Sequence, residues 1–150
     1  MQTWLCLLPY KSSRGCPGAP SRWRSKLADP QDQVSVLVVE DEPLLRLSMV
    51  TELELEGFTV FEAGNAAEAI EIIEANPEIR LLFTDVDMPG TMDGLLLAAF
   101  VRDRWPPIKI IVTSGHRLPE DCELPEGSPF MSKPYVVSEV ISTIRILVTG

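Results

Sequence analysis

The chain has 150 residues, of which 45% are hydrophobic, and this size and composition are typical of one globular domain with a single core. No apolar stretch reaches the roughly 18 residues that a membrane-spanning helix needs, so we expect no membrane contact. Residues 1–33 carry five basic and two acidic side chains, whereas residues 34–150 carry eight basic and twenty acidic ones. Because such an acidic domain repels nucleic acids, we expect no direct binding to them.

Residues 1–33 differ in composition from the rest of the chain. They hold four prolines, scattered serines and glycines, and no sustained hydrophobic period. A segment of this kind cannot bury enough apolar surface to fold by itself. We therefore predict a disordered tail over residues 1–33 and one folded domain over residues 34–150.

From residue 34 onward, strand-like and helix-like segments alternate. Short runs rich in β-branched and aromatic residues predict five strands, at residues 34–39, 58–61, 79–84, 108–112 and 128–131. Apolar stripes with helical spacing predict helices at about residues 43–56, 66–76, 94–104 and 136–147. Five β/α units of this length predict an α/β fold, with a parallel sheet and helices on both faces.

Local residues mark where the first two helices begin and end. Pro43 suits a first helical position, and Gly57 supplies the left-handed stop after that helix. Asn65 is a candidate N-cap for the second helix, with Glu68 three residues on as in a capping box. In contrast, residues 116–128 hold two prolines and four acids. We expect at most a short or irregular fourth helix there.

Polar side chains close four of the predicted strands. Asp85 follows the run LLFT, the pair Glu40 and Asp41 follows VSVLVV, Thr113 follows IKIIV, and Lys133 follows PFMS. The carboxyl ends of parallel strands meet at one edge of an open α/β sheet, and ligands bind at that edge. Three carboxylates, one ammonium and one hydroxyl together indicate a site for a divalent cation and a phosphoryl group, with a carboxylate as the nucleophile.

The three acids also indicate why a cation is needed. Two carboxylates about 5 Å apart repel each other by roughly 3 kcal/mol at an effective dielectric constant near 20. Mg²⁺ prefers octahedral oxygen ligands and relieves such repulsion. An acidic pair after a strand can instead cap the following helix, and Asp41 is suited to either role.

These segments resemble the receiver domain of bacterial two-component response regulators, in its single-domain, chemotaxis-regulator-like form. The resemblance covers about residues 34–148 and rests on VLVVEDE, DVDMPG with the following MDG, VTSG and FMSKPY. It implies a flavodoxin-like fold with strand order 2-1-3-4-5. Two features depart from the family pattern. GTMDG has one residue more than the commonest receiver sequence, and residues 116–128 stand where receivers have a full fourth helix.

The resemblance also implies a role for each site residue. Asp85 resembles the phosphoacceptor, and Lys133 resembles the lysine that contacts the phosphoryl oxygens. Thr113 corresponds to the switch hydroxyl and Phe130 to the switch aromatic. Because X-Pro bonds adopt the cis form far more readily than other peptide bonds, the bond between Lys133 and Pro134 is a cis candidate.

The implied cofactor is Mg²⁺. The resemblance assigns its ligands to Glu40, Asp41, Asp85 and the backbone carbonyl of Asp87, with Glu40 acting partly through water. Asp87 also lies where the family tunes the lifetime of the acyl phosphate. His116, the only histidine, is expected to be an ordinary loop residue rather than a phosphodonor.

The implied biology is signalling, not turnover of a separate substrate. The resemblance predicts a sensor histidine kinase or phosphotransfer protein as the phosphodonor and a downstream protein as the target. It describes a domain that takes part only in its own phosphotransfer and dephosphorylation, so we do not expect an enzyme. Three widely spaced cysteines without a CxxC pair argue against a disulfide framework or a zinc site and are typical of the reducing cytoplasm.

Two alternatives compete with this interpretation. A haloacid dehalogenase-type phosphatase also uses a DxD motif, a threonine or serine, and a lysine, which Asp85, Asp87, Thr113 and Lys133 match in order. In that family the nucleophile ends the first strand, whereas Asp85 ends the third predicted one, and only Glu139 follows Lys133 as a further acid. The second alternative is a receiver-like binding module that is never phosphorylated, but such a module would lack a site residue, and none is missing here.

Overall fold

The computed structural model describes residues 33–116, 118 and 124–150, so nearly all of the expected tail lies outside the described residues. The strands are β1 (Ser35–Val39), β2 (Thr59–Ala63), β3 (Ile79–Asp85), β4 (Lys109–Ser114) and β5 (Phe130–Ser132). The helices are α2 (Pro43–Leu55), α3 (Ala66–Ala75), α4 (Gly94–Arg104) and α5 (Val137–Thr149). Among the described residues, none of the helices has the length and apolar character of a membrane span.

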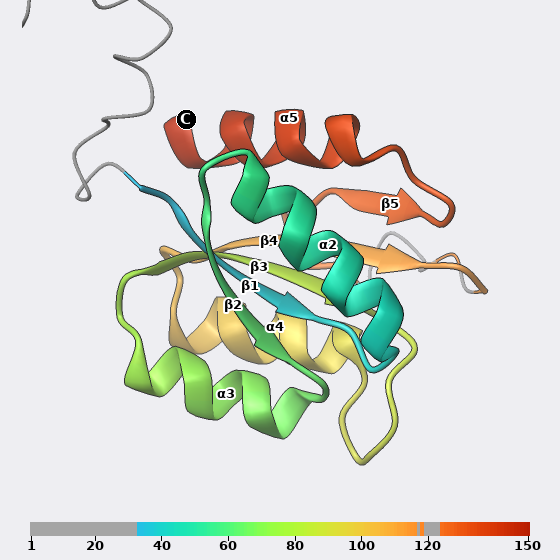
Figure 1. Ribbon diagram of the computed structural model, residues 1–150. Coiled ribbons are helices and arrows are strands. Elements are labelled where there is room, and N and C mark those ends of the chain that lie inside the picture. Colours follow the sequence, from blue (N-terminus) through green and yellow to red (C-terminus); the bar gives the residue numbers. More distant parts are fainter. Residues whose placement is uncertain (1–32, 117, 119–123) are drawn as a thin grey trace, which may run out of the picture.

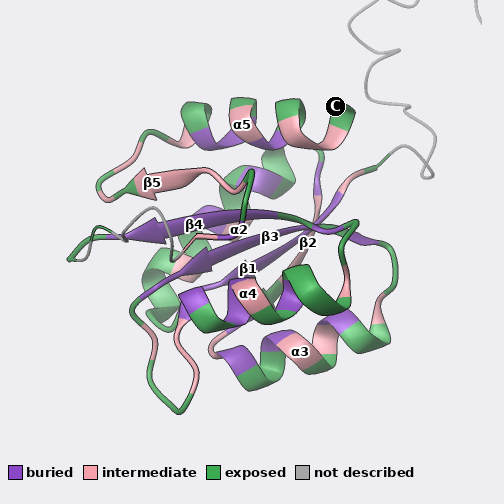
Figure 2. Ribbon diagram, turned by 180° about the vertical axis from the view of Figure 1, so that it is seen from behind, coloured by how far each residue is buried: buried purple, intermediate pink, exposed green. Residues whose placement is uncertain are grey.

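All five strands form one parallel sheet with the order β2-β1-β3-β4-β5, which confirms the predicted topology. Helices α2 and α5 cover one face of this sheet, and α3 and α4 cover the other (Figure 1). The three central strands are therefore enclosed on both sides, and they are buried along most of their length (Figure 2). Burial on both faces explains why these strands appear in the sequence as continuous apolar runs rather than alternating patterns.

The core consists of two apolar layers, one on each side of the sheet. In β1, Val36 and Val38 pack in the layer under α2 and α5, while Leu37 and Val39 pack in the layer under α3 and α4. Successive residues of a strand point to opposite faces, so a single short run contributes to both layers. This packing fixes β1 in the sheet and thereby fixes the position of the acids that follow it.

The predicted boundaries of helices α2 and α3 are largely confirmed. The Asn65 side chain accepts a hydrogen bond from the Glu68 N–H at 3.0 Å, and the Glu68 carboxylate accepts one from the Gly64 N–H at 2.8 Å. Gly57 has φ +93° where α2 ends, as expected for a left-handed stop. The N-cap of α2 is Glu42, without a side-chain cap, so the structure does not place Asp41 in the capping role.

The segment between β4 and β5 is the one where we expected at most a short or irregular helix. Its described residues, 115–116, 118 and 124–129, contain no helix, and the rest of the expected short or irregular helix lies outside the described residues. β5 begins at Phe130 rather than at the predicted Ser128. The Ser128 N–H donates instead to the Pro125 carbonyl at 3.0 Å, in a turn where Gly127 has φ +77°, so the chain becomes extended only after Pro129.

Candidate functional site

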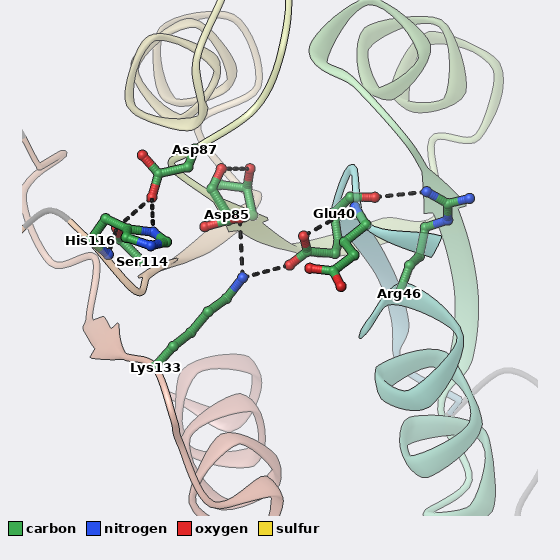
Figure 3. Close-up of polar contacts among 9 residues, drawn as sticks. Glu40, Arg46, Asp85, Asp87, Ser114, His116 and Lys133 are labelled. Atoms are coloured by element: carbon green, nitrogen blue, oxygen red, sulfur yellow. Dashed lines mark hydrogen bonds and ion pairs between the residues drawn. The ribbon is translucent and has the colours of Figure 1, made fainter. Parts of the chain in front are cut away.

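The carboxyl ends of four neighbouring strands bring the expected site residues to one edge of the sheet (Figure 3). Asp85 is the last residue of β3, and Thr113 lies opposite it in the pairing of β3 with β4. Glu40 directly follows β1, and Lys133 directly follows β5. Residues up to 93 positions apart in the sequence are thus neighbours because the strands that carry them pair in parallel.

Lys133 joins two of the acids. Its Nζ donates to Glu40 Oε2 at 2.8 Å and to Asp85 Oδ2 at 3.1 Å. The Glu40 and Asp85 side chains are almost fully buried, and the Lys133 side chain is mostly buried. The peptide bond between Lys133 and Pro134 is cis, as its sequence suggested. One ammonium therefore partly balances two buried carboxylates.

The protonation equilibria of these three groups reflect their burial and mutual charge. Burial raises the pKa of Glu40, against the lowering effect of Lys133, and the charge of Asp85 raises it further. Burial also raises the pKa of Asp85 above its ordinary value, again opposed by Lys133. For Lys133, burial alone would lower the pKa, but the hydrogen bonds to Glu40 and Asp85 outweigh it and the pKa is raised. The site therefore favours a charged lysine but disfavours the full negative charge of its two carboxylates.

Glu40, Asp41 and Asp85 form a group that fits a divalent cation. Each offers one carboxylate oxygen, and these oxygens all lie within 4.8 Å of one another. Oxygen donors from carboxylates are the ligands that Mg²⁺ prefers in proteins. A cation there would supply the positive charge that Lys133 alone does not. The expected fourth donor, the backbone carbonyl of Asp87, remains a prediction.

Two buried side-chain polar atoms in the described part of the chain have no hydrogen-bond partner, and both belong to this site. They are Asp85 Oδ1 and Thr113 Oγ1. Buried polar atoms are nearly always hydrogen-bonded, because leaving one unpaired costs about 1–3 kcal/mol. Two such atoms, one from each of two paired residues, indicate that the site is built for a ligand that would satisfy them.

The Asp87 carboxylate points away from Asp85 and toward the loop after β4 (Figure 3). Its Oδ2 accepts a hydrogen bond from Ser114 Oγ at 2.9 Å and lies 3.8 Å from His116 Nδ1. The backbone N–H of His116 also donates a hydrogen bond to Ser114 Oγ at 3.3 Å. The sequence analysis treated His116 as an ordinary loop residue, so this contact between the loop after β3 and the end of β4 was not expected.

Phe130 lies in β5 opposite Val112, one residue before Thr113 in the neighbouring strand. It is partly buried and packs against the apolar layer under α3 and α4. This position connects the strand that carries Thr113 with the strand that leads to Lys133. The role of Phe130 as a switch stays a prediction.

Arg46 is a residue of this region that the sequence analysis did not single out. It lies in the first turn of α2, and its Nη1 donates to the Glu40 backbone carbonyl at 2.7 Å (Figure 3). Its Nε lies 3.6 Å from Glu62 Oε2 on β2. The only sequence signal was a basic residue shortly after the acidic pair, and such a residue usually lies in solvent.

The chain is similar in sequence to receiver domains of response regulators. A family model described as the response regulator receiver domain matches residues 36–145. The response regulator receiver protein CpdR of Brucella abortus is 32% identical over 113 residues, which cover 73% of this chain and 92% of CpdR. The sensor kinase CckA of the same organism is 34% identical over 128 residues, which cover 80% of this chain.

Solved structures agree with these sequence matches. A response regulator receiver protein from Sinorhizobium medicae superposes with a TM-score of 0.74 at 27% identity, covering 79% of this chain and 97% of that protein. The chain spans only 13% of CckA, and 44% of the probable transcriptional regulatory protein NarL of Mycobacterium tuberculosis, so it corresponds to one part of those longer proteins. These matches give no support to the haloacid dehalogenase-type phosphatase considered above.

Proposed function

The chain belongs to the response regulator receiver domain family of two-component systems, and from this premise we propose that it accepts a phosphoryl group on Asp85. The observation that carries the proposal is the pairing of Asp85 with Thr113, because these two residues hold the buried polar atoms that lack a partner. A phosphoryl group on Asp85 would bring oxygens within reach of the Thr113 hydroxyl. Lys133, which already donates a hydrogen bond to Asp85, would contact the same phosphoryl group.

The chemistry is nucleophilic substitution at phosphorus. A carboxylate oxygen of Asp85 attacks the phosphorus of a phosphohistidine on the donor protein. The phosphorus–nitrogen bond breaks, and the donor imidazole leaves with the electron pair. Water later attacks the acyl phosphate, which releases inorganic phosphate and restores the Asp85 carboxylate. No separate substrate is turned over, so the domain is a phosphorylated signalling protein rather than an enzyme.

The surrounding residues stabilise the added charge. Lys133 remains beside the phosphoryl oxygens as a point charge, and Thr113 donates its hydroxyl hydrogen to one of them. Glu40, Asp41, Asp85 and the Asp87 backbone carbonyl would hold Mg²⁺, which when bound supplies positive charge against the acidic cluster and the incoming phosphoryl group. When Thr113 moves toward the phosphoryl group, Phe130 would move inward, and phosphorylation would shift the population from the unphosphorylated to the phosphorylated conformation.

The partners follow from the family. Receiver domains interact with sensor kinases, so we propose a histidine kinase or a phosphotransfer protein as the donor. A downstream protein that recognises the phosphorylated surface is the proposed target. Because the three widely spaced cysteines are typical of a reducing compartment, we propose that the domain acts in the cytoplasm. The strongly acidic surface makes direct contact with nucleic acid unfavourable.

Intact-mass analysis tests this proposal. The protein is incubated with acetyl phosphate in the presence of Mg²⁺ or of a chelator. We expect one added phosphoryl group in the wild type with Mg²⁺, and none in Asp85→Asn or with the chelator. Asp103→Asn, which changes an exposed acid on α4, is the control and should label like the wild type. Labelling that persists in Asp85→Asn would place the acceptor elsewhere, and labelling unaffected by the chelator would refute the Mg²⁺ assignment.

A further inference from the structure

We propose that Arg46 is a positioning residue for the cation site, acting through the peptide group that joins Glu40 to Asp41. This role rests on the proposed Mg²⁺ site, because Arg46 would hold in place the backbone that carries two of its ligands, Glu40 and Asp41. Arg46 itself is not a ligand, because a guanidinium has only hydrogen-bond donors to offer. Its contribution is to fix the direction in which the two acidic side chains leave the main chain.

The contacts of Glu40 show how this peptide group is held. The Glu40 N–H donates to the Ala63 carbonyl at 3.1 Å, which extends the pairing of β1 with β2 by one residue. The Glu40 carbonyl accepts from Arg46 Nη1 at 2.7 Å, the shorter of these two bonds. That carbonyl belongs to the peptide group between Glu40 and Asp41. The charged guanidinium of Arg46 therefore fixes this peptide group just beyond the last hydrogen bond between β1 and β2.

Asp41 depends on this anchor more than the other acids do. The Glu40 and Asp85 side chains are buried and bonded to Lys133. The Asp41 side chain is exposed, and no described residue forms a hydrogen bond or an ion pair with it. Its carboxylate nevertheless has an oxygen within 4.8 Å of oxygens of the other two acids. In the absence of a cation, only the backbone keeps Asp41 at this distance.

The surroundings of Arg46 are shaped to receive its guanidinium. A Cβ added to Gly64 would lie 3.2 Å from Arg46 Nη1, so a glycine at this turn leaves the room that the guanidinium occupies. The guanidinium Nε also lies 3.6 Å from Glu62 Oε2, and the Glu62 side chain is more than half exposed. An exposed ion pair of this length contributes little by itself. The bond to the Glu40 carbonyl is therefore the contact that matters for the site.

The test compares the affinity for Mg²⁺ alone in Arg46→Met and Glu62→Gln, by calorimetric titration of the full chain. Arg46→Met keeps an apolar side chain of similar length but removes the donor, and we expect about a tenfold weaker affinity, as for other residues that orient metal ligands. Glu62→Gln removes the exposed ion pair but keeps the bond to Glu40, and its affinity should match the wild type. In phosphorylation by acetyl phosphate, Arg46→Met should raise the Mg²⁺ concentration needed for half-maximal rate and leave the rate at saturating Mg²⁺ nearly unchanged.

Urea unfolding in a chelator separates positioning from folding. If Arg46→Met lowers stability but binds Mg²⁺ as tightly as the wild type, Arg46 is only a structural residue and the inference is wrong. An equal loss of affinity in Glu62→Gln would also overturn it, because the two variants share only the loss of the Arg46–Glu62 ion pair, and the bond from Arg46 to the Glu40 carbonyl would then not be the cause. If the wild type itself binds no Mg²⁺, the proposed cation site fails instead, and this outcome is visible before any variant is compared.

Discussion

Thr113 faces Asp85 across the pairing of β3 with β4, and each of these two buried residues holds a polar atom without a hydrogen-bond partner among the described residues. The neighbouring Thr84 is equally buried, but its hydroxyl donates to the Asp85 carbonyl at 3.0 Å. The two threonines lie at the same sheet edge, but only the hydroxyl of Thr84 has a hydrogen-bond partner among the described residues. This contrast supplies a matched pair of substitutions.

Replacing Thr113 with valine should stabilise the unphosphorylated domain. Valine has nearly the same shape and removes a buried hydroxyl that has no partner, so the free energy of unfolding should rise by about 1 kcal/mol. Thr84→Val should instead lower it by about 1 kcal/mol, because a satisfied hydrogen bond is lost. Urea unfolding without Mg²⁺ measures both. Destabilisation of both variants by similar amounts would show that the Thr113 hydroxyl is satisfied in solution.

The Asp85→Asn variant should be more stable than the wild type when no cation is present. The raised pKa of Asp85 means that its ionised form is less favourable in the folded site than in water. Removing that charge leaves Lys133 paired with Glu40, and the gain should be about 1 kcal/mol, a common size for such relief. Mg²⁺ should stabilise the wild type but scarcely affect the variant. If Mg²⁺ raises the urea midpoint of both proteins equally, the cation binds somewhere other than the Asp85 site.

The same pKa shifts give a pH dependence with a definite sign. Glu40 and Asp85 both have a folded-state pKa above their ordinary values of 4.5 and 3.8. Their contribution to stability is therefore present below those values and is lost as the pH rises through the raised ones. The raised pKa of Lys133 contributes stability that is fully present below its ordinary value of 10.5 and is lost only above it, so it adds no slope in this range. Without a cation, Asp85→Asn should consequently flatten the decline of stability from about pH 4 toward neutrality. An unchanged slope would mean that Asp85 does not contribute to it.

Gly94 allows the close approach of α4 to the phosphoacceptor strand. A Cβ at this position would overlap the Asp85 backbone carbonyl, and the Gly94 N–H donates to the Val86 carbonyl at 3.0 Å. Gly94→Ala should therefore cost about 3 kcal/mol, the upper range for overpacking, and should disturb Asp85. Gly115→Ala is the control, since its Cβ would lie 3.5 Å from the Lys133 Cβ, an ordinary contact. Equal thermal stability of the two variants would contradict the packing described for Gly94.

The proposed switch predicts where the domain responds to phosphorylation. Beryllofluoride with Mg²⁺ mimics the phosphoryl group, and we expect it to slow hydrogen exchange in β4 and around Phe130. The helix α3, which carries Ile70 and Ile73, should be unchanged. Exchange mass spectrometry of the two regions gives the answer. A response of equal size in α3, or none near Phe130, would refute the switch assignment even if Asp85 is phosphorylated.

Much of the fold could be predicted from the sequence because its patterns are local. Apolar runs and helical stripes located five strands and four helices, and Gly57 and Asn65 marked boundaries that the structure shares. The order of the strands rested on the resemblance to receivers, since no local pattern specifies it. The start of β5 was placed too early because the sequence does not reveal that the turn before Pro129 uses the Ser128 N–H.

The site was predictable in part for the same reason. Acids, a hydroxyl and a lysine that directly follow strands must meet at one sheet edge, and the structure brings Glu40, Asp85, Thr113 and Lys133 together there. The contact of Asp87 with Ser114 and the contact of Arg46 with the Glu40 carbonyl were not foreseen. Both depend on side-chain direction in three dimensions, which neither spacing nor residue type determines.

Chemical trapping of the acyl phosphate tests the central claim most directly. The protein is phosphorylated with acetyl phosphate and Mg²⁺, reduced with borohydride, and digested for peptide mass spectrometry. Borohydride reduces an aspartyl phosphate to homoserine, so the account predicts homoserine at position 85 only in the phosphorylated sample. Homoserine at Asp41 or Asp87 in place of Asp85, or no reduction product despite one bound phosphoryl group, would contradict it.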